Sequence, residues 1–348
     1  MTMDAAKIST VAGGVHRGSV LRALFLRPEL TAFVSVLVVF AFFALTAGDA
    51  GFLSFTGTKN YLQVAAEIGI IATPITLLLV AGEFDLSVGT MIAAAGISVA
   101  FPISFLGWPL WACIGSGLVV ATLVGSANAF LVVRLNMPSF LATLGMMFVL
   151  RGVTLGLTLM LTGATQIFRL KATLGSDPLL PLFSGTPLGL PIALYWWLLF
   201  VAVAAYMLAS TRYGNWIYAS GGDRDAAVKM GIPVGALKLV LYILTAMAAV
   251  IVAMVQMFYV DITDVTQGLG KEFEAITAAV VGGAAITGGI GSPVGTAFGT
   301  LMFGMISQGF FYTDINDNWY YAFVGLMLIG AVIINTYTRK AAMRRPSR

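Results

Sequence analysis

Cysteine, histidine and charged residues are scarce in this sequence, and each shortage excludes a class of protein. The single cysteine, Cys113, allows no intramolecular disulfide and no four-thiolate metal site. The single histidine, His16, argues against histidine-based zinc sites and catalytic triads. Charged residues make up 10% of the 348 residues, whereas a soluble domain carries about 25%. The chain therefore lacks the charge that the surface of a soluble protein of this length would need.

The chain is rich in apolar residues. They make up 59% of the chain, and the mean hydropathy is +0.95. These values indicate an integral membrane protein. At about 20 residues per crossing, ten helices would use roughly 200 residues and leave only loops and tails. We therefore expect no additional soluble domain of ordinary size.

Ten apolar runs are long enough to cross a membrane. They cover about residues 30–47, 62–81, 88–106, 109–133, 138–161, 190–209, 237–259, 272–287, 293–312 and 319–337. We therefore predict an all-α polytopic membrane protein with about ten transmembrane helices, forming one transmembrane domain over residues 30–337. Glycines crowd the eighth and ninth runs, which predicts a glycine-rich hairpin with an irregular turn near the C-terminus.

The two ends of the chain are polar. Residues 1–29 contain no short apolar core followed by a cleavage site, so they predict a cytoplasmic N-terminal arm rather than a secretory signal. Residues 338–348 predict a basic cytoplasmic tail. The sequence pI is about 9.2, but the basic residues cluster at the ends of apolar runs, as topology signals do. We therefore exclude nucleic acid as a partner.

The distribution of Lys and Arg predicts the orientation in the membrane. An even number of spans places both termini on one side and divides the loops into two sets. The set on the side of the termini contains Lys7, Arg17, Arg22, Arg27, Arg134, Arg212, Arg224, Lys229, Lys238, Arg339, Lys340, Arg344, Arg345 and Arg348. The opposite set contains only Lys59, Arg169, Lys171 and Lys271. By the positive-inside rule, both termini lie in the cytoplasm.

Arg151 lies midway along the fifth run. A charge at that depth costs at least about 2.5 to 3.5 kcal/mol unless it is paired or reaches water. We therefore expect Arg151 to face the protein interior or an aqueous path. A role in transport is one alternative. The other is a structural pair, either with a carboxylate such as Glu67 or with carbonyl groups at a helix end.

Glycines recur at intervals of four residues in two of the runs. Gly291, Gly295 and Gly299 have this spacing around the start of the ninth run, and Gly152 and Gly156 repeat it in the fifth. Small residues at that interval let helix backbones approach each other closely. We interpret them as sites of tight helix packing, with a moving hinge or a pore-lining role as the alternative.

Residues 82–89, between the second and third runs, carry Glu83, Asp85 and Ser87. Two carboxylates and a hydroxyl can satisfy the first N–H groups of the following helix, and glycines at both ends allow a sharp turn. One interpretation is therefore a capped turn, with Ser87 as the cap. The alternative is an unwound segment that lines a transport path, where polar backbone is tolerated at membrane depth. No histidine or metal-ligand cluster accompanies the carboxylates, so we predict that the chain is not an enzyme.

Three segments, in this order, resemble a known family. Residues 82–89 are similar to the Gly-Gly-Ile-Asp-Leu-Ser-Val-Gly signature of the permeases of ATP-binding-cassette sugar importers, of the ribose, xylose, arabinose and autoinducer-2 type. Residues 140–145, followed by Arg151-Gly152, resemble that family's Thr-Leu-Gly with a downstream Arg-Gly. Residues 274–296 resemble its glycine-rich C-terminal block. The match extends over nearly the whole chain, although Glu83-Phe84 stands where the family usually has Gly-Ile.

A further resemblance lies between the sixth and seventh runs. Residues 221–231 are similar to the family's coupling segment, Glu-Ala-Ala-x-x-x-Gly, with Asp in the place of Glu. Apart from the resemblance, the pattern favours a short capped helix with one thin face and a glycine stop, with a plain solvated loop helix as the alternative. The residues that the resemblance assigns to contact with an ATPase are Asp223, Arg224, Asp225, Ala226, Ala227 and Gly231.

The energy source must lie outside this chain, because the sequence contains no phosphate-loop pattern. The resemblance implies a separate cassette ATPase subunit that binds ATP and magnesium, and we expect no cofactor or metal on this chain. It also implies a periplasmic sugar-binding protein, and the outer loop at 162–189, with Arg169 and Lys171, is its expected docking surface. A second permease copy or paralogue would complete a path at the dimer interface, within the lipid of a bacterial inner membrane.

The resemblance implies an ATP-driven importer of a monosaccharide or a related polyol or sugar signal. Because selectivity in that family rests largely on the binding protein, we expect no deep specific site in this chain. The alternative is an ion-coupled secondary transporter of a small polar solute, with Glu67, Asp85 and Arg151 as relay or ion site. The residues that we expect along the path or gate are Glu83, Asp85, Ser87, Arg151 and Gly283.

Overall fold

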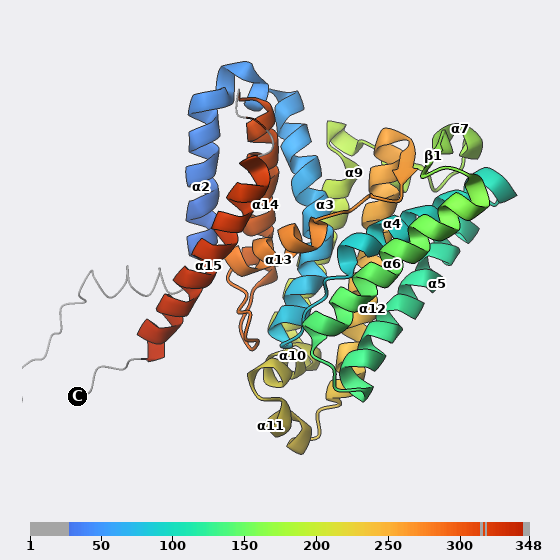
Figure 1. The fold of residues 1–348 in the computed structure, drawn as a ribbon. Helices are drawn as coiled ribbons and strands as arrows, with labels where there is room; N and C mark the ends of the chain where they lie inside the picture. The colour runs from blue at the N-terminus through green and yellow to red at the C-terminus, as the bar shows by residue number, and fades with distance from the viewer. Residues whose placement is uncertain (1–27, 314–315, 317–318, 344–348) are drawn as a thin grey trace, which may run out of the picture.

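The apolar runs form helices that cross between two ends of the molecule (Figure 1). The structure, a computed structural model, describes residues 28–313, 316 and 319–343. Its α-helices are α2 (Pro28–Ala47), α3 (Phe55–Val80), α4 (Val88–Phe101), α5 (Leu110–Ala129), α6 (Ser139–Thr162), α7 (Leu170–Leu174), α8 (Pro181–Ser184), α9 (Ile192–Ser210), α10 (Arg212–Gly222), α11 (Arg224–Lys229), α12 (Val234–Val260), α13 (Lys271–Val281), α14 (Pro293–Phe311) and α15 (Trp319–Met343). The other elements are the short π-helices η1 (Gly48–Phe52), η2 (Pro102–Leu106) and η3 (Phe130–Arg134), the 3-10 helix η4 (Pro187–Gly189), and the strands β1 (Gln166–Phe168) and β2 (Ile262–Asp264).

Eight of the described helices are long and apolar enough to cross a membrane. They are α2 with η1, α3, α4 with η2, α5 with η3, α6, α9, α12 and α14, and they correspond to eight of the predicted runs. The predicted tenth run corresponds to α15, whose described apolar part, Trp319–Gly330, is shorter. These helices confirm an all-α polytopic membrane protein.

The predicted eighth span is not a continuous helix. In its place, α13 contains 11 residues and so covers about 17 Å at 1.5 Å per residue, or about half of a 30 Å bilayer core. Gly283, two residues after the end of α13, adopts a positive φ angle of 98°, which no α-helix accommodates. Gly288 and Gly289 continue the turn with φ angles of 82° and 77°. The prediction of a spanning helix at 272–287 is therefore wrong, whereas the irregular turn before α14 is confirmed.

The two ends of the molecule differ in what they carry. One end, here called the α11 end, holds α10 and α11, and the other, called the β end, holds β1 and α7 (Figure 1). Helix α2 begins and α15 ends toward the α11 end (Figure 1). This placement agrees with the prediction that both termini lie on one side. Most of the predicted arm at 1–29, and the last residues of the tail at 338–348, lie outside the described residues.

A small antiparallel sheet joins two segments at the β end. Gln166 of β1 pairs with Asp264 of β2, and Phe168 pairs with Ile262. The backbone N–H of Arg169 also donates to the carbonyl of Asp261, at 3.1 Å. The predicted outer loop at 162–189 is therefore attached to the end of α12 by strands that its polar composition did not indicate.

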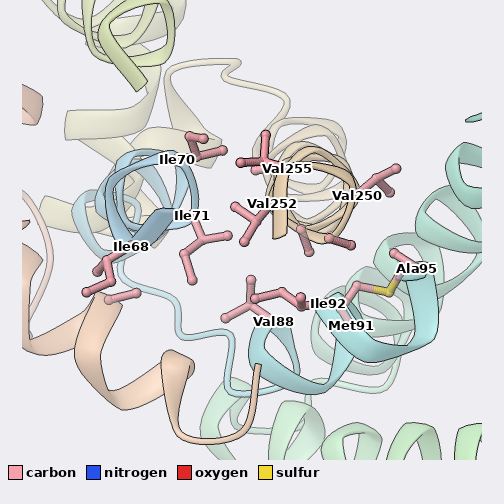
Figure 2. Packing of buried hydrophobic residues seen from close by; sticks show 14 of the residues in the cluster. Ile68, Ile70, Ile71, Val88, Met91, Ile92, Ala95, Val250, Val252 and Val255 are labelled. Carbon is pink, nitrogen blue, oxygen red and sulfur yellow. The ribbon is translucent and has the colours of Figure 1, made fainter. Parts of the chain in front are cut away.

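The main hydrophobic core lies where α3, α4 and α12 meet. Figure 2 shows Ile71 of α3, Val88 and Ile92 of α4, and Val252 of α12 pointing toward one another. Of the spanning helices described, α3 is the most enclosed, because 89% of its most apolar stretch is buried inside the protein.

Glycine spacing has different consequences in α14 and in α6. A Cβ atom at Gly295 or Gly299 would lie 2.0 Å from the carbonyl oxygen of Gly282 or 2.2 Å from that of Ala278, so only glycine permits this contact between α13 and α14. Tight packing is confirmed here. Gly152 and Gly156 of α6 have nothing within 4 Å in the described part of the chain, so none of the described helices packs closely on them.

Candidate translocation site and coupling surface

The segment between α3 and α4 is extended, and side chains of two other helices hold its backbone. The N–H of Phe84 donates to Ser139 Oγ at 3.1 Å, and the N–H of Leu86 donates to Thr143 Oγ1 at 3.0 Å. The hydroxyl of Tyr242, on α12, donates to the carbonyl of Phe84 at 3.1 Å. Since buried backbone polar groups need partners, these contacts from α6 and α12 allow the segment to remain unwound inside the protein.

A buried ion pair also holds this segment. The ammonium group of Lys238, on α12, donates to a carboxylate oxygen of Glu83. Lys238 is 4% exposed, because it lies one turn inside α12 on the face that packs on the bundle. Lys238, one of the basic residues predicted on the side of the termini, is therefore buried and paired rather than exposed. The extra charge at Glu83, where the sequence departs from the family pattern, is compensated by a cation from a distant part of the chain.

Asp85 holds the turn that precedes α4, and Ser87 makes no capping hydrogen bond to the helix. The Oδ1 atom of Asp85 accepts from the N–H of Ser87 at 2.9 Å and from the Ser87 hydroxyl at 2.6 Å. Ser87 Oγ in turn accepts from Nδ2 of Asn128, on α5, at 2.8 Å, and it accepts from no N–H of α4. The predicted cap by Ser87 therefore does not form. Asp85 stabilises the turn instead, and the network also ties α5 to the segment. A role for Asp85 and Ser87 in lining a path stays a prediction.

Arg151 lies on the exposed side of α6. It does not pair with Glu67, whose carboxylate is held by Gln63 and Gln256. Arg151 interacts electrostatically with Glu272, at the start of α13. Glu272 is buried, and its Oε2 atom has no hydrogen-bond partner within the described part of the chain. Arg151 therefore faces away from the interior of this chain, and its reaching an aqueous path stays a prediction.

The turn between α13 and α14 contacts α3 and α10 at the α11 end. The N–H of Gly289 donates to the carbonyl of Val80, the last residue of α3, at 2.8 Å. A Cβ atom at Gly221, near the end of α10, would lie 1.8 Å from that same carbonyl oxygen and 2.8 Å from the nitrogen of Gly289. Gly283, a predicted gate residue, has a φ of 98° where α13 gives way to the turn. The contact of the three segments depends on glycine.

Helix α11 is a short, capped projection at the α11 end. Oδ1 of Asp223 accepts from the N–H of Ala226 at 2.9 Å, and Gly231 follows the helix with a φ of 81°, as predicted. Ala227 is fully buried against its own chain, so it is not part of an exposed thin face. The outward apolar side chains are Val228, 54% exposed, and Met230, 68% exposed. Arg224, Asp225 and Ala226 are also exposed.

The two basic residues predicted to dock a binding protein lie at the β end. Arg169 is exposed and has a φ of 60°. Lys171 is half-buried, and its N–H donates to Oδ1 of Asp261 at 2.8 Å. Asp261 therefore holds the start of α7 and fixes the position from which Arg169 projects.

An open pocket of about 640 Å³ lies near the β end, between α3, α12, α14 and β2. Its lining is rich in amide side chains, and it also contains two carboxylates. The lining residues are Asn60, Gln63, Val64, Glu67, Gln256, Tyr259, Val260, Ile262, Asp264, Thr266, Gln267, Gln308 and Phe311. On α3, the lining residues fall at intervals of three and four, so they share one helix face.

A chain of hydrogen bonds orders the polar side of this pocket. Oε1 of Glu67 accepts from Gln63 at 2.6 Å, and its Oε2 accepts from Gln256 at 2.8 Å. Gln267 donates to Gln256 Oε1 at 3.0 Å. Burial raises the pKa of the Asp264 carboxyl, but hydrogen bonds from neighbouring groups lower it more, and the net pKa lies below the ordinary value. Asp264 is therefore ionised at neutral pH.

Comparison with known proteins shows what the chain is related to. Residues 57–332 match the family described as "Branched-chain amino acid transport system / permease component". The chain belongs to this permease family. The probable ABC transporter permease protein YphD of Escherichia coli K12 is 31% identical over 307 residues, which cover 88% of this chain and 89% of YphD.

Two other relatives carry the names of sugars. The ribose import permease protein RbsC of Haemophilus influenzae is 28% identical, with 89% of this chain and 93% of RbsC covered. The xylose transport system permease protein XylH of Escherichia coli K12 is 26% identical, with 88% of this chain and 91% of XylH covered. No solved structure matches the chain.

In this permease, the segments that carry the family resemblance meet in space. Residues 82–89 are held by Ser139 and Thr143, at the start of the second segment, and Thr143 belongs to its Thr-Leu-Gly motif. The third segment contacts the end of α3 through Gly289. The motifs are therefore parts of one structure at the α11 end. As a permease, the chain is a transport subunit and not an enzyme.

Sequence reasoning missed the partners of these segments and the pocket. Lys238, Asn128 and Tyr242 sit in runs that are otherwise apolar, so an isolated polar residue inside a span was the available signal. The same signal marks Gln63 and Gln256. What the sequence could not indicate is which of these residues meet, because the partners lie as far as 189 residues apart along the chain.

Proposed function

We propose that this permease is the membrane subunit of an ATP-driven importer for a monosaccharide or a related polyol or sugar signal. The observation that carries the proposal is that relatives named for ribose and xylose transport align with about nine-tenths of this chain and of their own length. A fructose import permease, FrcC of Rhizobium meliloti, is 29% identical over 86% of this chain. The relatives thus favour a sugar over the amino acids in the family's description.

The importer needs partners at both ends of the permease. A cassette ATPase, carrying ATP and magnesium, binds α11 in the cytoplasm through Asp223, Arg224, Asp225, Ala226 and Gly231, with Ala227 supporting the helix from beneath. A periplasmic sugar-binding protein docks at the β end, on Arg169 and Lys171. A second copy or paralogue covers the exposed face of α6, and both termini lie on the cytoplasmic side of a bacterial inner membrane. The transmembrane domain covers 30–337, with the coupling segment at 221–231.

The geometry supports a direct route from the ATPase to the path. Helix α11 follows α10 without a loop, since Asp223 alone lies between them. Gly221 of α10 lies in backbone contact with the end of α3 and with the turn before α14. A displacement of α11 would therefore move the extended segments on both sides of Gly221. Glu83, Asp85, Ser87 and Gly283 lie on those segments, which supports their assignment to the gate.

An ion-coupled transporter was the alternative, and its expected cluster does not form. Glu67 is bonded to Gln63 and Gln256, and Asp85 is bonded to Ser87. Within the described residues, no hydrogen bond or ion pair joins Glu67, Asp85 and Arg151. Arg151, exposed at membrane depth beside Glu272, is assigned instead to a path between two permease copies.

Reconstitution of the importer tests the proposal. We expect the permease, combined in proteoliposomes with the ATPase and the binding protein encoded beside it, to take up radiolabelled D-ribose, D-xylose or D-fructose only when ATP is supplied. An ATPase subunit whose hydrolysis is disabled serves as the control. Uptake by the permease alone, driven by a proton or sodium gradient, would contradict the proposal.

A further inference from the structure

The pocket between α3, α12 and α14 has the position of a solute vestibule. It opens near the β end, on the side assigned to the binding protein. Glu67 is the lining residue of α3 farthest from that end. The Glu67 carboxyl interacts electrostatically with Lys271 and Glu274 of the short helix α13. The volume of the pocket, about 640 Å³, falls in the range of about 300 to 1,000 Å³ that small-molecule sites occupy.

Asp264 supplies a negative charge to the pocket. Glu67 is the other acidic lining residue, and the described lining residues include no Lys or Arg. The ammonium group of Lys271, which lies near Glu67, is paired with Glu274 at 2.7 Å. An anionic group entering the pocket would therefore meet repulsion with no free cation to offset it.

The hydrogen-bonding groups of the pocket are arranged in advance. Each oxygen of the Glu67 carboxylate accepts one bond from an amide and retains capacity for a second. Gln267 and Gln256 are oriented by the bond between them, at 3.0 Å. Gln308, from α14, makes no side-chain hydrogen bond within the described part of the chain. Its donor and acceptor are both free for a ligand.

This combination suits hydroxyl groups. A hydroxyl both donates and accepts, so neighbouring hydroxyls of one solute can donate to Glu67 or Asp264 and accept from amide N–H groups. The aromatic rings of Tyr259 and Phe311 add an apolar wall for the C–H face of such a solute. A branched-chain amino acid carries an ammonium group, which Asp264 would attract, and a carboxylate next to it, for which the described lining offers no cation. The unpaired carboxylate is the charge that disfavours the amino acid against a neutral solute.

We propose that this pocket binds neutral polyhydroxylated solutes and rejects α-amino acids during passage through the permease. The proposal rests on the proposed function in sugar import. It assigns to the membrane subunit a selectivity that the sequence led us to expect only in the binding protein. Glu67 and Gln308 are the residues that contact the solute.

The test measures access to a cysteine at the pocket edge. The permease–ATPase complex in nanodiscs carries Cys113→Ser and Val260→Cys, and the rate of labelling by a thiol reagent is followed. The added solutes are D-ribose, D-xylose, D-fructose, ribitol and L-leucine. We expect at least one of the four polyols to slow labelling with a saturable dose dependence, and L-leucine to have no effect. A cysteine at Val119, exposed on α5 outside the pocket, should label at a rate that no solute changes.

A second variant identifies the contact. Gln308→Leu should raise the half-saturating polyol concentration about fivefold, which is the effect of losing one hydrogen bond, and Gln308→Asn should restore part of the affinity. Thr122→Val, on the exposed side of α5, serves as the matched control and should leave it unchanged. Because Gln308 has no partner in the described chain, its replacement leaves no group unpaired there.

The outcomes separate the pocket from the proposed function. Sugar uptake by the complete importer, without protection of Val260→Cys by any of the four polyols, would overturn the pocket and leave the function standing. Protection by polyols in a complex that transports no sugar would support the pocket and contradict the function. Protection by L-leucine equal to that by the polyols would overturn the selectivity.

Discussion

At the scale of single residues, the ion pair between Glu83 and Lys238 joins the unwound segment to α12. Both side chains are nearly enclosed, and a buried pair contributes little net stability when complete but costs several kcal/mol when one partner is removed. The pair therefore acts as a constraint. It keeps the segment on α12 in the one arrangement that leaves neither charge alone.

Neutralising one member of this pair should destabilise the permease more than neutralising both. We expect Glu83→Gln and Lys238→Met each to cost about 3 to 5 kcal/mol, because each leaves its partner unpaired. The double variant should unfold closer to the parent than either single variant. Thermal unfolding of the purified proteins, followed by intrinsic fluorescence, measures this.

Lys229→Met is the matched control, since Lys229 is an exposed cation on α11. It should leave the unfolding midpoint close to that of the parent. Losses that simply add in the double variant would show that the two residues do not act as a unit.

At the scale of elements, helical backbone is interrupted at two places inside the bundle, and only the interruption after α13 falls within a predicted span. Helix α4 begins only after the extended segment at 82–87, and α13 ends before the glycine turn at 282–292. Such interruptions are tolerated in a membrane where other protein groups satisfy the backbone, as Ser139, Thr143 and Tyr242 do. Both interruptions lie against α10 and are therefore within reach of α11.

The outward face of α11 should carry the contact with the ATPase. We expect Val228→Asp and Met230→Asp each to weaken co-purification of the ATPase about tenfold, because each places a charge on an apolar interface residue. Membrane insertion and thermal stability should stay normal, since both side chains are exposed. A pull-down of the ATPase, beside an uptake assay, measures the effect.

Ala227→Trp provides the contrast. Ala227 is fully buried, so a larger side chain should lower the thermal stability of the permease itself. If the ATPase bound Val228→Asp and Met230→Asp as well as the parent, the partner would contact another surface.

At the scale of the whole molecule, the α11 end and the β end should lie on opposite sides of the membrane. In a Cys113→Ser background, cysteines at Ala172 on α7 and Ala226 on α11 are both exposed. We expect a membrane-impermeant thiol reagent to label Ala172→Cys in intact cells and Ala226→Cys only after lysis. Labelling of both positions in intact cells would refute the proposed orientation.

Much of the architecture follows from composition and from the spacing of apolar runs. Eight spans and the irregular turn before α14 were predictable, because a bilayer demands a minimum apolar length and glycines interrupt a helix. The cap at Asp223 and the stop at Gly231 were also predictable, since both depend on contacts within a few residues.

Tertiary structure alone decided which polar residues meet. The partner of Glu83 is 155 residues away, and the amides around Glu67 come from two different helices. The short length of α13 was decided in the same way, because its apolar sequence permits a longer helix but the turn must meet Val80 and Gly221. The sequence by itself determined the helices and the family, since both rest on local pattern. The gate contacts and the pocket depend on distant segments packing together, and no local pattern specifies that.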